Sequence, residues 1–349
     1  MAETTVTGSG IPPGREFVPE SLDSVVSGLE RKRRRAVIAY WGTVLALVMC
    51  LPVLAAPFLF LAWLGIHPAP GSLSADLLLQ ARAWIEPYKD WVGPVLFCWP
   101  AAGLLAMAWA FRRFAMRPRH TYIGEYKRLV FTAVSRQHFP QLVYEPAEGI
   151  HWQLFDASGL FPYTSDAYRS EDRFTGRWGS TEVCFAEANA ERKRRHWADK
   201  DLDTVYETYF HGIVFIADFN KHFRSTTRLL PKGVKVARAP GEERAILEDP
   251  HFESAFETWT TDQVDVRYIL STSMISRLSA LNRRFPGLRA RFHDEHLMLL
   301  LPSPIDRFEP SLYRVARSRT QIEAFVSDVR ACLSLVDDLN LNTRIWSKD

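Results

Sequence analysis

Cysteine is scarce in this sequence of 349 residues, which contains only four cysteines and no Cys-x-x-Cys pair. This scarcity argues against a disulfide-rich secreted domain and against a zinc site built on cysteines, and it fits a reducing, cytoplasmic environment. The sequence also lacks the HExxH, GxSxG, Walker and GxGxxG motifs. It therefore indicates no common catalytic or nucleotide-binding class, and it predicts no cofactor.

The chain has no large excess of charge of either sign, because 43 basic residues stand against 40 acidic ones. A nucleic-acid-binding protein normally needs a wide basic face, so we expect no nucleic-acid partner. Residues 1–120 contain 12 basic and 8 acidic residues, whereas the rest of the chain contains 31 and 32. The small positive excess therefore lies around the apolar segments.

Two long segments lack charged side chains altogether. Residues 36–66 form an uncharged run of 31 residues, and residues 92–111 form a second run of 20. About 20 helical residues suffice to cross the hydrocarbon of a bilayer, and buried helices of soluble proteins seldom remain uncharged for so long. The sequence therefore predicts two transmembrane helices, 36–66 and 92–111, with the lipid bilayer as a partner.

Basic residues flank these two segments on the sides away from the connecting loop. Those before the first segment are Arg31, Lys32, Arg33, Arg34 and Arg35, and those after the second are Arg112, Arg113, Arg117 and Arg119. Lys and Arg favour the cytoplasmic side, so we expect a multi-pass membrane protein with both termini in the cytoplasm. Residues 67–91 should form a short outside loop that carries an interfacial amphipathic helix.

Small residues recur within both predicted spans. The first contains Gly42 and Ala46, and the second contains Ala102, Ala106 and Ala110 at intervals of four. Such stripes allow helices to approach closely, so they predict that the two spans pair with each other or that the protein self-associates. Neither span contains an ionisable side chain, which argues against an ion or proton pathway.

The remainder of the chain divides into a tail and a folded domain. Residues 1–30 are expected to be a flexible N-terminal tail, and residues 120–349 a cytoplasmic α+β domain with a mainly antiparallel sheet and packed helices. Strands are predicted at 181–188 and 205–219, the second of them apolar on both faces as in a central strand.

Further along the chain, helical and strand patterns follow one another in runs. A helix is predicted over 121–139, and a hairpin over 288–301 that turns at residues 293–295. Thr260 with Gln263, and Thr320 with Glu323, have the spacing of capping boxes, which predicts that two further helices begin there.

Several motifs of this domain resemble a known bacterial family. They are HGIVFIADFNKHFRSTTRLLP (211–231), LEDPHFESAFETWTTDQVDVRYILSTSMISRL (247–278), SGLFP (158–162), SEDRFTG (170–176) and DDLNLNTRIW (337–346). In these motifs the chain resembles the domain-of-unknown-function family 3137 over about residues 120–346. The resemblance implies a membrane-anchored bacterial inner-membrane protein, and it implies no activity.

Candidate binding residues occur in two clusters. They are Asp218, Asn220, Lys221 and His222 after the predicted central strand, and Asp262, Arg267 and Tyr268 in the second long motif. Turn formation and helix-surface ion pairs are the alternative roles of these side chains. His293 and His296 lie three residues apart but lack a third ligand in the sequence, so no metal site is predicted.

A run of four basic residues is the strongest electrostatic feature of the domain. It comprises Arg192, Lys193, Arg194 and Arg195, and we expect it at the solvated tip of a long hairpin. Together with the residues at 31–35, this run is a candidate for contact with anionic lipid headgroups.

These patterns favour a non-catalytic binding or scaffold protein at the membrane, with another protein as its partner. The alternatives are a hydrolase-like enzyme with a site near Asp218–His222 and an accessory subunit of a transport complex. A single pocket that gathers Asp218, His222, Glu248 and Arg267 would favour the enzyme, whereas scattered positions and an exposed apolar patch would favour the binding protein.

Overall fold

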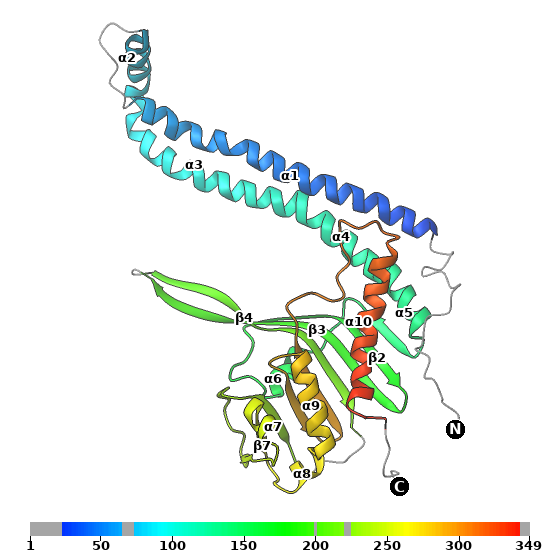
Figure 1. The fold of residues 1–349 in the computed structure, drawn as a ribbon. Coiled ribbons are helices and arrows are strands. Elements are labelled where there is room, and N and C mark those ends of the chain that lie inside the picture. The colour runs from blue at the N-terminus through cyan, green and yellow to red at the C-terminus, as the bar shows by residue number, and fades with distance from the viewer. Residues whose placement is uncertain (1–22, 65–72, 199–200, 220–224, 343–349) are drawn as a thin grey trace. The chain divides into compact units, whose positions relative to one another are not determined.

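The computed structural model describes residues 23–64, 73–198, 201–219 and 225–342. The chain forms two compact units (Figure 1). Among the described residues, the helical unit comprises Val25–Glu125 with Leu312–Ala316, and the α+β unit comprises Tyr126–Ser311 and residues 317–342. Each unit is described by itself below.

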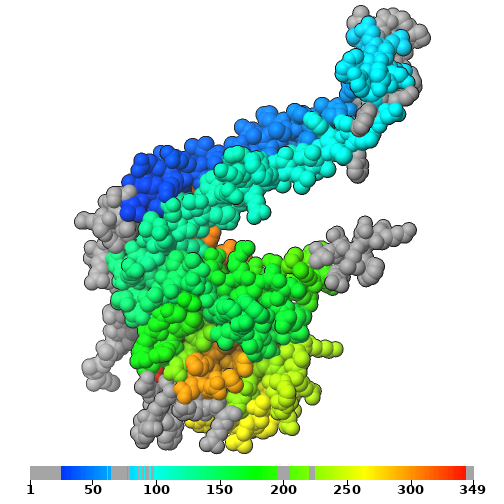
Figure 2. Space-filling view, turned by 180° about the vertical axis from the view of Figure 1, so that it is seen from behind, coloured from blue at the N-terminus to red at the C-terminus, as the bar shows by residue number. Residues whose placement is uncertain are grey.

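The helical unit is built on two long helices. Its elements are α1 (Asp23–Leu64), α2 (Leu73–Ile85), η2 (Glu86–Tyr88), α3 (Lys89–Ala110), η3 (Phe111–Met116) and α4 (Arg117–Tyr126). Helices α1 and α3 lie side by side in both views (Figure 1, Figure 2). They approach closely at Gly103, where an added Cβ atom would collide with the side chain of Leu54. Residues 23–30, which the sequence assigned to a flexible tail, form the first turns of α1, and residues 1–22 lie outside the described part.

The first turns of α1 are held by polar contacts within this unit. Glu30 accepts hydrogen bonds from the guanidinium groups of Arg33 and Arg34, three and four residues further along the helix. Arg33 also donates to the carbonyl oxygen of Leu312 at 3.0 Å, and the backbone N–H of Ala316 donates to Glu30 at 3.0 Å. The charges around the start of α1 therefore favour a helix there.

One helix among the described residues is long and apolar enough to cross a membrane. It spans Val25–Phe60 of α1, and its most apolar stretch has a mean hydropathy of 2.4 with no residue buried. The sequence predicted two such helices, but only this first one meets the criterion. The second predicted span, 92–111, lies largely in α3 and is helical, but it does not meet this criterion among the described residues.

The α+β unit contains one antiparallel sheet. Its strands are β1 (Leu142–Glu145), β2 (Ala167–Trp178), β3 (Thr181–Ala198), β4 (Asp201–Asp218), β5 (Thr227–Pro231), β6 (Glu243–Ala245), β7 (Phe256–Thr260), β8 (Arg289–His293) and β9 (His296–Pro302). Their order in the sheet is β1-β2-β3-β4-β9-β8-β5-β7-β6, and the described neighbours all pair antiparallel. This architecture confirms the predicted mixed α+β fold with a mainly antiparallel sheet.

Helices flank this sheet. They are η4 (Lys127–Phe131), α5 (Thr132–His138), α6 (Trp152–Ala157), α7 (Pro250–Ala255), α8 (Asp265–Ile269), α9 (Thr272–Arg284) and α10 (Arg319–Asp338). The helix predicted over 121–139 and the hairpin at 288–301 are present. The first predicted capping box is wrong, because Thr260 ends strand β7. The helix predicted from the second is present as α10, although its N-cap is Ser318 rather than Thr320.

Strand β4 is buried on both faces, as predicted. On one face Val214 joins Phe155, Leu300 and other apolar side chains in a hydrophobic core. On the other face Phe215 lies beside Phe185, which continues into an aromatic cluster around Phe325 of α10. The alternation of side chains along a strand thus supplies two cores from one sequence segment.

Phe325 is the centre of that aromatic cluster, because its ring stacks on Phe131 at 4.0 Å between centroids and also contacts Tyr144, Phe174 and Phe308. We expect the substitution Phe325→Ala to lower the free energy of unfolding by about 3–5 kcal/mol, since it leaves a cavity among rigid rings.

The measurement is the urea midpoint of the full chain in detergent, followed by tryptophan fluorescence. Val264→Ala is the matched control, because Val264 is 78% exposed and its truncation should leave the midpoint unchanged. Equal midpoints for the two variants would contradict the central role of Phe325.

Candidate functional site

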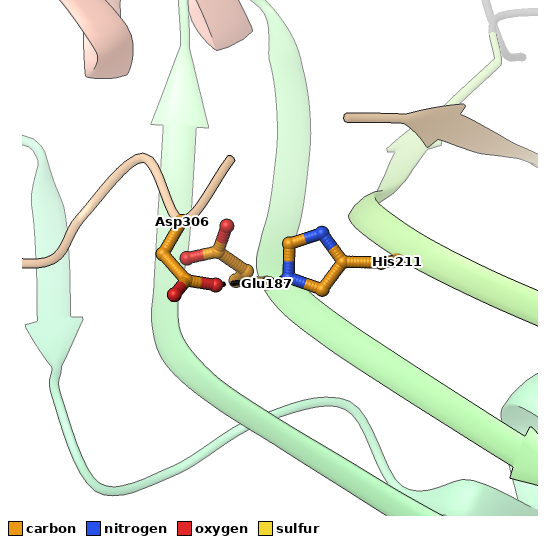
Figure 3. Close-up of side chains that lie close together, drawn as sticks. All are labelled: Glu187, His211 and Asp306. Atoms are coloured by element: carbon orange, nitrogen blue, oxygen red, sulfur yellow. Dashed lines mark hydrogen bonds and ion pairs between the residues drawn. The ribbon is translucent and has the colours of Figure 1, made fainter. Parts of the chain in front are cut away.

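Three side chains with metal-ligating chemistry meet beside the long β3–β4 hairpin. Glu187 lies on β3, His211 lies on β4, and Asp306 lies in the segment between β9 and α10 (Figure 3). One ligand atom from each of them lies within 4.8 Å of the other two. The cluster therefore joins two strands and a loop that are far apart in the sequence.

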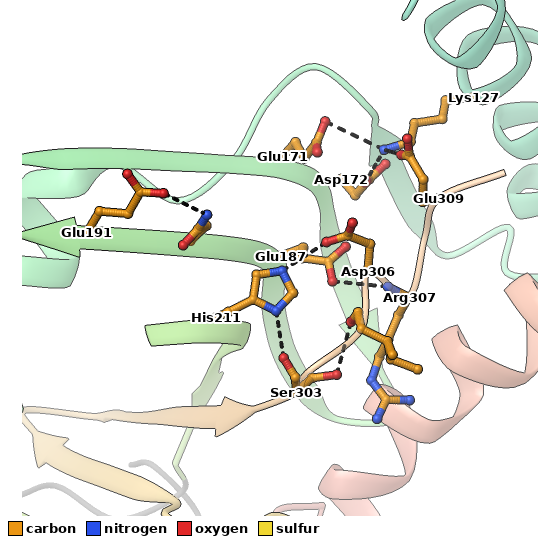
Figure 4. A network of polar contacts seen from close by, with 12 residues as sticks. Lys127, Glu171, Asp172, Glu187, Glu191, His211, Ser303, Asp306, Arg307 and Glu309 are labelled. Carbon is orange, nitrogen blue, oxygen red and sulfur yellow. Dashed lines mark hydrogen bonds and ion pairs between the residues drawn. The ribbon is translucent and has the colours of Figure 1, made fainter. Parts of the chain in front are cut away.

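Both ring nitrogens of His211 have partners. Nδ1 lies 2.6 Å from the carbonyl oxygen of Ser303, and Nε2 lies 2.9 Å from Oδ1 of Asp306 (Figure 4). A carbonyl oxygen can only accept, so Nδ1 carries a hydrogen. Burial acts to lower the pKa of His211, but the bonds to Ser303 and Asp306 outweigh it and raise that pKa.

Gly212 explains why the chain after β9 comes so close to His211. Its φ of +154° is unfavourable for residues with a side chain, and a Cβ atom there would collide with the carbonyl oxygen of Leu301. The backbone N–H of Ser303 donates to the carbonyl oxygen of His211 at 2.9 Å. The glycine therefore allows the contact that places Ser303 and Asp306 at the imidazole.

Glu187 is a buried carboxylate with a relative exposure of 6%. Oε1 accepts a hydrogen bond from the backbone N–H of Arg307 at 3.0 Å. Burial raises the pKa of Glu187 to about 7, and the nearby carboxylates of Asp172 and Asp306 act in the same direction. The protonated form of this carboxyl is therefore more stable here than in water.

A second buried polar network lies at the neighbouring bulge of β2. Lys127 of η4 pairs with Asp172 at 2.7 Å, and it also lies 3.0 Å from Glu309 and 3.5 Å from Glu171 (Figure 4). The hydroxyl of Tyr144 donates to Asp172 at 2.5 Å. Burial acts to lower the pKa of Lys127, but the three acids raise it, so this ammonium stays charged. The network ties η4 to the sheet, which is a structural role.

The first cluster predicted from the sequence is only partly described. Asp218 is the last residue of β4 and pairs with His296 in the sheet, whereas Asn220, Lys221 and His222 lie outside the described residues. Asp218 lines an open groove of about 560 Å³, together with Val143, Thr175, Cys184 and Ile216 among others.

The second predicted cluster lies elsewhere, around α8. Asp262 accepts hydrogen bonds from the backbone N–H groups of Val264 and Asp265, so it shapes a turn, and Arg267 donates to the carbonyl oxygen of Gln263. Tyr268 is 48% exposed. Neither these residues nor Glu248 line the groove that contains Asp218.

The basic run of the hairpin lies within strand β3 rather than at its tip, because β3 and β4 continue their pairing to Ala198 and Asp201. Arg192 and Arg194 both lie near Glu207 of β4, at 2.8 and 3.5 Å. Lys193 is exposed and lies over the ring of Tyr206. The side chain of Arg195 is outside the described set. Glu207 thus offsets part of the charge expected there.

Sequence reasoning missed Glu187, His211 and Asp306. One signal was present: Glu187 interrupts an apolar strand on the face that carries Phe185. A charged residue on the inner face of a strand is unusual and points to a partner. Asp306 gives no such signal, because only the fold brings its loop to the hairpin.

The fold and the first helix define a mixed α+β protein with an N-terminal helix apolar enough for a membrane anchor. Residues 208–341 match the model of a family described as "Protein of unknown function (DUF3137)". This match confirms for residues 208–341 the family suggested by the sequence motifs, and residues 120–207 lie outside it.

Two further comparisons add little. No curated protein matches the chain. The crystal structure of the mycobacterial trehalose monomycolate transport factor A, TtfA, is similar at 10% identity with a TM-score of 0.26, covering 49% of this chain and 74% of that one. A likeness at this level supports no inference about fold or function.

Proposed function

We propose that this protein is a membrane-anchored binding or scaffold protein of the bacterial inner membrane, whose α+β unit binds another protein at the cytoplasmic face without catalysing a reaction. The observation that carries the proposal is α1, whose most apolar stretch has no buried residue. Each exposed Å² of apolar surface costs about 25 cal/mol in water, so a surface of this length favours a bilayer.

The pairing of helix α1 with helix α3 extends this proposal to α3, which we propose as a second membrane span. Described apolar side chains of α3 are also exposed, with Leu104 at 60%, Leu105 at 73% and Trp109 at 64%. The α1–α3 contact at Gly103 supports two helices that cross together. A groove of about 690 Å³ remains between the small residues of the two helices, so these stripes do not close on each other completely.

The flanking arginines support the orientation with both termini in the cytoplasm. Among the described residues, Arg31, Arg35, Arg112, Arg113 and Arg117 have no acidic partner at salt-bridge distance. Each basic residue near an anionic leaflet contributes about 1 kcal/mol of attraction. We therefore assign lipid contact to these arginines ahead of the run in β3, where Glu207 competes.

A binding role is favoured over the hydrolase alternative by the positions of the predicted residues. Asp218 lines the open groove, whereas Glu248 and Arg267 do not. One register row of the sheet crosses this groove and presents Val143, Thr175, Cys184 and Ile216. A mostly apolar row on an open sheet face suits a protein partner. No observation on the described residues favours a transport-complex subunit over this role.

The topology is tested with reporters in the full chain. Alkaline phosphatase, which is active only after export, should be active when inserted between Ile85 and Glu86 and inactive when fused after Asp349.

Crosslinking in native membranes, followed by purification through the α+β unit, should recover a protein partner. The same crosslinking with Ile216→Arg, which places a charge in the groove, is the matched comparison.

The possible outcomes separate the two parts of the proposal. Phosphatase activity only after Asp349 would overturn the orientation. A chain that is extracted by alkaline carbonate would overturn the anchor. An unchanged crosslinking pattern in Ile216→Arg would contradict the groove as the binding surface.

A further inference from the structure

The ligand atoms of Glu187, His211 and Asp306 have the chemistry and spacing of a metal centre. Two carboxylates and one imidazole lie within 4.8 Å of one another. Metal–oxygen and metal–nitrogen distances of about 2.0–2.2 Å place neighbouring ligand atoms roughly 3–3.5 Å apart, so small side-chain rotations bring the three groups onto one ion. Such rotations are feasible for Asp306, whose side chain is 65% exposed.

The tautomer of His211 supplies a second argument. Its Nδ1–H is committed to the carbonyl oxygen of Ser303 at 2.6 Å. In the neutral ring, the lone pair of Nε2 therefore points at the carboxylate oxygen of Asp306, 2.9 Å away. Two acceptors repel each other at this distance, so the pair needs a proton or a metal cation between them. Histidines that ligate metals characteristically donate their other N–H to a backbone carbonyl, as His211 does.

Asn189 is a neighbour of this cluster in the sheet. It lies directly opposite His211 in the β3–β4 register and two residues from Glu187, on the same face of β3. Its Nδ2 group donates to Glu191 at 3.4 Å, whereas Oδ1 is buried and has no hydrogen-bond partner in the described structure. An amide oxygen is a good ligand for hard or borderline divalent cations.

The local charge also matches a divalent cation. When both groups are ionised, Glu187 and Asp306 together bring two negative charges, and a neutral imidazole adds none. The guanidinium of Arg307, the residue after Asp306, is paired with Asp328 at 3.0 Å, and Arg307 reaches Glu187 through its backbone N–H. The two carboxylates are therefore not neutralised by this arginine.

We propose that Glu187, His211 and Asp306, with Oδ1 of Asn189 as a further ligand, bind one divalent first-row transition-metal ion. One nitrogen and three oxygen donors suit ions such as Zn²⁺, Mn²⁺ or Fe²⁺ better than soft Cu⁺. The ion fastens the segment after β9 to the β3–β4 hairpin, and this proposal is independent of the membrane role proposed above.

The test uses the full chain in detergent, with any purification tag removed and metals stripped by a chelator. Titration with Zn²⁺ and with Co²⁺, whose visible absorption reports its ligands, should show one equivalent bound per chain. Asp306→Asn and His211→Asn should each weaken binding at least about tenfold. Weaker metal binding in Asp306→Asn is not explained by misfolding, because the side chain of Asp306 is largely exposed.

The matched control is the double variant His293→Gln with His296→Gln, which removes the two histidines of the β8–β9 turn and should bind metal as the parent chain does. Absence of stoichiometric binding in the parent chain would overturn the proposal and leave a protonated His211–Asp306 ion pair. Binding that survives in both Asp306→Asn and His211→Asn, or that is lost in the control, would overturn it as well.

Discussion

Replacing Lys127 with methionine will lower the free energy of unfolding by about 3–5 kcal/mol, because the change leaves Asp172 as a fully buried carboxylate without its cation. Glu309 and Glu171 lie within 3.5 Å of the same ammonium, so without it the three carboxylates also repel one another. The measurement is the urea midpoint of the full chain in detergent.

A double variant separates charge from packing. Lys127→Met combined with Asp172→Asn removes both buried charges, and it should recover part of the lost stability. Arg177→Met is the matched control, since Arg177 pairs with Glu182 on the surface, where both side chains are at least 60% exposed. A Lys127→Met midpoint equal to that of Arg177→Met would show that the buried network does not hold η4 on the sheet.

Two arginines in α1 will prevent this helix from crossing the membrane. Met49 and Val53 are 67% and 57% exposed and lie near the middle of the uncharged segment. Each arginine at the centre of a span costs about 2.5–3.5 kcal/mol on insertion, so Met49→Arg with Val53→Arg costs about 5–7 kcal/mol. We expect the phosphatase inserted between Ile85 and Glu86 to lose its activity.

Val264→Arg is the control for this experiment. Val264 lies in the α+β unit and is 78% exposed, so the same chemical change there should leave the phosphatase activity intact. If the double-arginine chain keeps full activity outside the cell, α1 is not the segment that carries this loop across the bilayer.

Local patterns in the sequence predicted much of the secondary structure. The apolar run of residues 213–217 predicted a central strand, because the side chains on both faces of such a strand would be apolar. In the structure β4 is buried on both faces. The hairpin of β8 and β9 was predicted from two apolar runs around a polar turn. These features depend on neighbours a few residues away, which the sequence displays directly.

Two local predictions failed where strand pairing overrode the local signal. Thr260 and Gln263 have capping-box spacing, yet Thr260 pairs with Thr227 of β5 and with Glu243 of β6. Likewise, the basic run at 192–195 has the polarity of a loop, but β3 and β4 extend through it in continuous register. Ladder hydrogen bonds between strands, which the local pattern does not show, decided both cases.

The sequence by itself determined that the chain has a long apolar helix near its N-terminus and a separate α+β part, because hydrophobicity and period are properties of contiguous residues. Only the tertiary structure decided that Glu187, His211 and Asp306 meet, since they come from three segments that up to 119 residues separate. Strand pairing and the close approach at Gly212 bring these segments together, and the partner segment cannot be read from the sequence of any one of them.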